Sequence, residues 1–64
     1  MDKKFYKEVL EAAYIKTAKD LTEANKELKK LKKNGNEEEV KDVMHEIEKL
    51  REFKKKIAME VMGL

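Results

Sequence analysis

The sequence predicts an all-α protein, an antiparallel two-helix hairpin with helices over about 2–33 and 37–62 and a turn over 34–36. Two observations predict this fold. Apolar residues recur every three to four positions in both halves of the chain, which is the spacing of one face of a helix. Residues that favour turns gather at one place, Asn34-Gly35-Asn36, and the 64-residue chain has no Pro and only two Gly. This length leaves room for one domain, residues 1–64.

The first helix is expected to begin after Asp2, whose carboxylate can cap it. Its apolar and small residues alternate in steps of four and three, which keeps one seam facing a partner helix. The seam consists of Leu10, Tyr14, Thr17, Leu21, Ala24, Leu28 and Leu31.

The turn is predicted from four local signals. Gly35 can take the left-handed conformation that ends a helix, and Asn34 tolerates it. Asn36 can cap the second helix, with Glu39 completing a variant of the capping box. Lysines crowd the end of the first helix and Glu37–Glu39 crowd the start of the second, as the helix dipole favours.

The second helix has a matching seam and is expected to end at Gly63. The seam consists of Val40, Val43, Ile47, Leu50, Lys54, Ile57, Val61 and Leu64. Lys54 is out of place in it. Either its stem lies along the seam with the ammonium reaching water, or the helix rotates to bring Phe53 inward. We expect Phe53 inward, because Thr17 and Ala18 opposite are small.

More apolar residues are present than one seam can bury, and they gather at the open end of the hairpin, away from the turn. Such a surplus is expected to be covered by another molecule. We expect a homo-oligomer, a dimer above all, that forms a four-helix bundle; the alternative is a helix of another protein. The predicted interface comprises Phe5, Val9, Ala12, Ile15, Phe53, Ala58, Met59 and Met62.

Residues that carry catalysis are scarce. The chain has no Cys and one His, and it contains no Ser, so most of the usual nucleophiles are missing. His45 is expected on the solvent side, and a metal site would need ligands from a second subunit. We therefore expect a non-enzymatic interaction or regulatory module without a cofactor or metal.

Nucleic-acid binding is the alternative function. Lys3, Lys4, Lys7 and Lys16 could contact phosphates, and the aromatic residues between them could stack on bases. The net charge of only +2 argues against it, because acids stand one turn from most of the lysines. The short apolar sector and the N-terminal Met1-Asp2-Lys3-Lys4 predict a cytoplasmic protein without a membrane partner.

In architecture the predicted hairpin resembles the Rop-type plasmid-copy regulators. Those proteins are helical hairpins of similar length that dimerise into a four-helix bundle and bind RNA hairpins. The resemblance implies a dimeric bundle and strengthens the RNA-binding alternative. It lies in the fold alone, because no residue motif of that family is found in this sequence.

Overall fold

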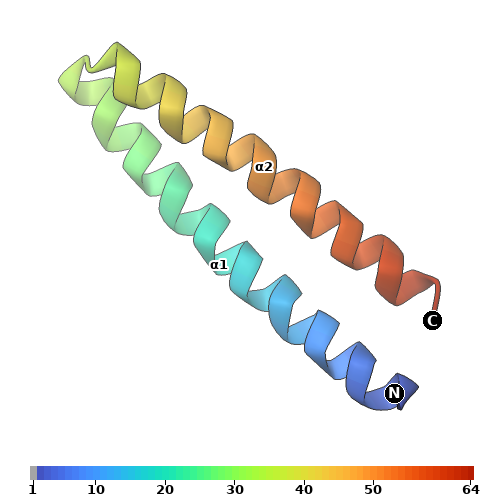
Figure 1. Cartoon of the computed structure of the whole chain (residues 1–64). Coiled ribbons are helices and arrows are strands. Elements are labelled where there is room, and N and C mark those ends of the chain that lie inside the picture. Colours follow the sequence, from blue (N-terminus) through green and yellow to red (C-terminus); the bar gives the residue numbers. More distant parts are fainter. Residues whose placement is uncertain (1) are drawn as a thin grey trace.

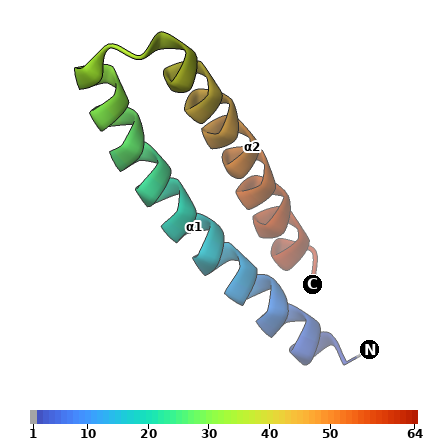
Figure 2. The same ribbon diagram turned by 60° about the vertical axis from the view of Figure 1, so that its left-hand side comes forward.

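A computed structural model describes residues 2–64 as two antiparallel α-helices joined by a tight turn (Figure 1). Helix α1 spans Lys3–Asn34 and helix α2 spans Glu37–Met62. The molecule is a rod of 49 × 15 × 14 Å with both chain ends at the same end. With 32 residues against 26, α1 projects beyond the end of α2 (Figure 2). The predicted all-α hairpin is confirmed, with each helix boundary within one residue of its expected place.

The helix ends carry the predicted caps. The Asp2 carboxylate accepts a hydrogen bond of 3.1 Å from the backbone N–H of Lys4. The Asn36 side chain accepts one of 3.2 Å from the backbone N–H of Glu39. Both donors belong to the first turn of a helix, where no intrahelical acceptor is available.

The turn is a Schellman motif centred on Gly35. Gly35 has a φ of +70°, and its N–H donates to the carbonyl of Lys32, while the N–H of Asn36 donates to the carbonyl of Leu31. The Asn36 N–H is therefore already bonded and does not need the Glu39 side chain. Only the Asn36 half of the predicted capping box is seen. Gly63 ends α2 in a right-handed conformation, with a φ of −78°.

The core follows the predicted seam. Leu21, Ala24, Val43 and Ile47 are buried together. Leu28, Leu31 and Leu50 pack against this cluster. Nearer the open end, Thr17 and Ile57 are also buried. The Thr17 hydroxyl donates to the carbonyl of Ala13 at 2.7 Å, which satisfies a polar group that burial would otherwise penalise.

Lys54 occupies its seam position in a way that differs from our expectation. Lys54 is half-buried, and its Nζ lies 5.2 Å from the centroid of the Tyr14 ring. Phe53 is 51% exposed, so the prediction that it turns inward is wrong. Tyr14 itself stands at the exposed edge of the seam rather than in the core. Its ring offers a cation–π partner beside water, so Lys54 can occupy the seam without rotating α2 away from the register that buries Ile57.

Candidate interaction surface

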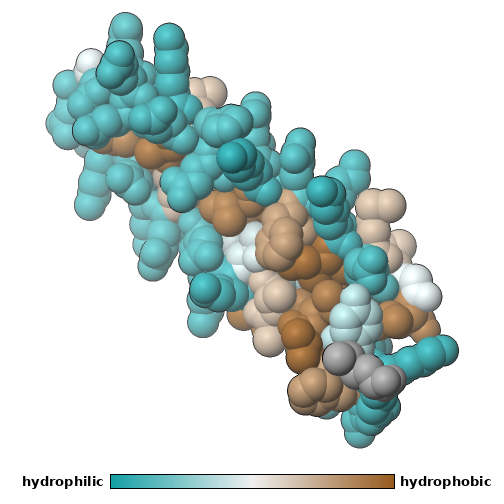
Figure 3. Space-filling view, viewed as in Figure 1, coloured by the Kyte–Doolittle hydropathy of each residue, from teal (hydrophilic) through white to brown (hydrophobic). Residues whose placement is uncertain are grey.

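Exposed apolar side chains concentrate in the open half of the hairpin. Figure 3 shows hydrophilic residues covering the turn end and hydrophobic ones gathering towards the chain ends. The large exposed apolar residues of this half are Phe5, Val9, Tyr14, Ile15, Phe53, Met59, Met62 and Leu64. Within residues 2–64, Met44 is the one such residue in the half beside the turn. Of the predicted interface, seven residues are exposed and Ala58 is half-buried.

Three of the predicted interface residues lie together in a groove between the two helices. Ile15 comes from α1, and Ala58 and Met62 come from α2. The groove is completed by Glu11, Tyr14 and Val61. Glu11 is the one charged residue in it, so the groove is a mainly apolar depression with a carboxylate at its edge.

The other predicted interface residues lie elsewhere, as the heptad positions show. Phe53 stands one heptad from Glu60, whose side chain bonds Tyr6 across the helices on the far side of the seam. Phe5 and Ala12 stand one heptad apart on the back of α1, and Met59 stands on the back of α2. The eight predicted residues therefore belong to several faces and not to one continuous surface.

The Tyr6–Glu60 hydrogen bond ties the helices together on the far side of the seam. The Tyr6 hydroxyl donates to Oε2 of Glu60 at 3.1 Å. This hydrogen bond raises the pKa of Tyr6 above 10.0, and the negative charge of Glu60 and slight desolvation act in the same direction. Both partners are at the surface, so the bond can be broken by a substitution without opening the core.

A second groove continues the first towards the turn. It is lined by Asn25 and Leu28 of α1 and by Met44, Ile47, Glu48 and Arg51 of α2. The sequence prediction did not include Glu11, Tyr14 and Val61 in the interface, nor the residues of this second groove. The heptad pattern of the sequence could have identified both grooves. The positions that flank a seam on one side line the groove between the two helices.

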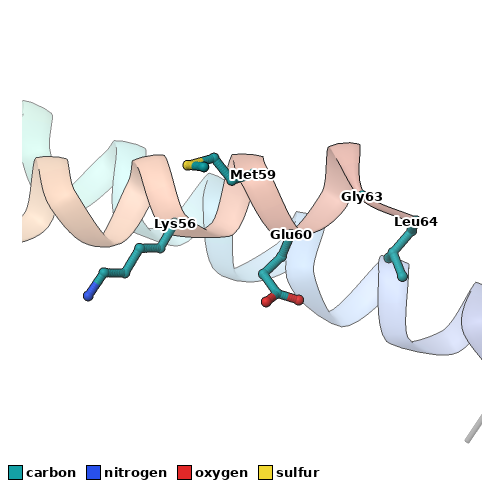
Figure 4. Close-up of a pocket in the computed structure, with 5 residues that line it drawn as sticks. All are labelled: Lys56, Met59, Glu60, Gly63 and Leu64. Carbon is teal, nitrogen blue, oxygen red and sulfur yellow. The ribbon is translucent and has the colours of Figure 1, made fainter.

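A further concavity lies at the end of α2 and is formed by fewer elements. Its lining consists of Lys56, Met59, Glu60, Gly63 and Leu64, with no residue of α1. Figure 4 shows the Lys56 and Glu60 side chains extending to one side of the helix while Met59 lies on the other. These side chains do not converge on a common point.

The four lysines named for nucleic-acid contact do not form one patch. All four are exposed on α1. Lys4 stands one heptad from Glu11, on the groove side, whereas Lys16 stands one heptad from Val9, towards the other side. Within residues 2–64 no three His, Cys, Asp or Glu side chains come together as a metal site.

Neither helix over residues 2–64 contains a stretch apolar enough to span a bilayer. Comparison of the chain with protein-family models, with curated proteins and with solved structures gave no match.

Proposed function

We propose that this chain is a non-enzymatic helical hairpin that self-associates through the apolar surface of its open half and serves as a protein-interaction module. The observation that supports the proposal is the groove between the helices, with exposed Ile15 and Met62 on its two sides. Ile15 is 57% exposed and Met62 is 84% exposed, and a second copy would cover both.

The size of the hydrophobic effect favours covering this surface. Fully burying one such side chain contributes about 1.5–3 kcal/mol. A domain of average size is stable by only about 5–15 kcal/mol, and a chain of 64 residues lies at the low end because it buries little surface. Burial of even three or four of these side chains in an interface would therefore rival the stability of the isolated hairpin.

A second copy is the occupant that the shape of the molecule favours. Each hairpin offers a two-helix layer with one filled seam, and two such layers stacked on each other make a four-helix bundle. In a dimer with two-fold symmetry the same surface of each copy meets its equivalent, so both apolar grooves are covered at once.

Sedimentation equilibrium tests the proposal. At micromolar concentration the chain should sediment as a species heavier than the 7.6 kDa monomer. Ile15→Asp should dissociate it, because a carboxylate in the groove would lose water on assembly without a partner. Glu38→Lys, at an exposed position beside the turn, should leave the assembly intact. A wild-type chain that remains a monomer, or an Ile15→Asp variant that still assembles, would contradict the proposal.

A further inference from the structure

The two grooves lie on one face of the hairpin, which we call the groove face. Every residue lining the turn-side groove stands one or two heptads from a residue lining the open-end groove. The pairs two heptads apart are Glu11 with Asn25, Tyr14 with Leu28, Met44 with Ala58, Ile47 with Val61, and Glu48 with Met62. Because heptad-related positions share one side of a supercoiled helix, the two grooves form one strip along the molecule.

The opposite face differs in charge, and we call it the carboxylate face. The hydrogen bond between Tyr6 and Glu60 marks its position. Stepping by heptads from these two residues gives Ala13, Asp20 and Glu27 on α1 and Phe53, Glu46 and Glu39 on α2. Five of these eight positions beside the seam are carboxylates and none is basic, whereas Lys16 and Lys56 stand further out on the same side. Two copies packed through this face would bring like charges together, which opposes assembly.

We infer that the second copy in the proposed dimer docks on the groove face, with the two-fold axis running parallel to the helices. The inference rests on the proposed function and adds to it the face used and the orientation of the partner. Such an axis sets α1 of each copy on α2 of the other at the same height along the rod. Both turns then lie at one end of the dimer.

The parallel orientation is favoured because it brings the apolar residues of the two copies together. Ile15 of each copy meets Ala58 and Met62 of the other, so the open-end grooves cover each other. If the axis ran across the helices and the rods overlapped fully, each apolar open end would face the charged turn of the other copy. Full overlap covers the groove face along its whole length in either orientation, but only the parallel one sets the apolar open end of each copy on that of the other.

Charges at the edge of the groove face also match in this orientation. Tyr14 stands across from Lys54 within each hairpin, so Glu11 and Lys55 differ in height by only two residues, about 3 Å along the rod. The parallel dimer brings Glu11 of one copy towards Lys55 of the other, and the two-fold axis makes this pair twice. Glu11, the lone charge of the apolar groove, thereby gains a partner of opposite sign.

Charge reversal tests the docked face. Glu11→Lys and Lys55→Glu should each raise the dissociation constant of the dimer about fivefold, and the double variant should return it close to the wild-type value. Glu46→Lys on the carboxylate face is the matched control and should not raise it. Circular dichroism checks that each variant keeps its helices, which is expected because all three positions are exposed.

The orientation is measured by a spin label beside the turn. The chain has no Cys, so Lys33→Cys on the outer side of α1 carries a single label. The inference predicts a distance between the two labels well below the 49 Å length of the hairpin, whereas an axis across the helices predicts a distance near or above that length.

The outcomes separate the two proposals. A wild-type chain that remains monomeric overturns the proposed function. A wild-type dimer overturns the inference alone if the labels are far apart, if the double charge reversal fails to restore binding, or if Glu46→Lys raises the dissociation constant as much as Glu11→Lys does.

Discussion

The half of the hairpin beside the turn and the open half share one seam but use their apolar residues differently. Beside the turn, Leu21, Ala24, Val43 and Ile47 form a closed cluster, and the exterior seen in Figure 3 is mostly hydrophilic. In the open half, Thr17 and Ile57 continue the seam, while large apolar side chains remain in water. A two-helix layer can bury one stripe of each helix, so any additional stripe depends on another molecule. The first half buries its apolar residues within the hairpin, whereas the second leaves the surplus on which the proposed association depends.

The largest expected effect on stability comes from comparing the same substitution, Ile to Ala, at one position in each half. Ile47→Ala should lower the free energy of unfolding by about 3 kcal/mol, because Ile47 is only 5% exposed and its loss leaves a cavity in the core cluster. Ile15→Ala, at the exposed groove, should lower it by about 0.5 kcal/mol or less in dilute solution. Urea titrations at concentrations where the chain is monomeric measure both. Equal losses from the two variants would mean that the two halves do not differ as described.

The next largest effect on stability is expected at one of the two glycines. Each glycine ends a helix, and they lie at opposite ends of the rod. Gly35→Ala should destabilise the hairpin by about 1 kcal/mol, since its φ of +70° is unfavourable for a residue with a Cβ atom. Gly63→Ala should have almost no effect. Its φ is −78°, and an added Cβ would meet only ordinary contacts of 3.6 Å. Thermal unfolding of the two variants tests the difference, and a loss at Gly63 as large as that at Gly35 would contradict it.

The smallest expected effect is at the Tyr6–Glu60 bond of the open half. The raised pKa of Tyr6 means that the folded state favours the neutral hydroxyl. The bond therefore contributes stability below pH 10, and this contribution is lost as the pH rises through the pKa of Tyr6 in the folded state. Glu60→Gln should bring the pKa of Tyr6 back towards its usual value, because the negative charge is removed.

An NMR titration of the Tyr6 ring measures this shift and distinguishes Tyr6 from Tyr14. Glu52→Gln, at an exposed position of α2 nearer the turn, is the matched control and should leave the pKa of Tyr6 unchanged. An unchanged titration of Tyr6 in the Glu60→Gln variant would show that the hydrogen bond is not formed in solution.

Most of the fold could be predicted from the sequence because it depends on local chemistry. The seam repeats every three to four residues, Gly35 supplies the left-handed residue, and Asn36 supplies a cap; each acts within one turn of the chain. The prediction failed at Phe53 and Lys54. There the choice depended on the Tyr14 ring, 40 residues from Lys54 along the chain, which accepts the ammonium at the edge of the seam.

The interface prediction was also limited because it depends on how residues far apart in the chain are brought together. Counting apolar residues beyond the seam identified Ile15, Ala58 and Met62, which the structure brings into one groove. The count also grouped Phe53 with them, although Phe53 lies on the carboxylate face. Which flank of α1 adjoins which flank of α2 depends on how the two helices are placed side by side, and this was not used in the prediction.

The sequence by itself determined two helices, the turn between them, the seam and the surplus of apolar residues in the open half, because each follows from spacing and from contacts within a few residues. Only the tertiary structure decided how Lys54 is accommodated, that Tyr6 bonds Glu60, and that the surplus is divided among the groove face, the carboxylate face and the backs of the helices. The physical reason is that these features arise between side chains far apart in the chain, and only the packing of α1 against α2 brings them within reach.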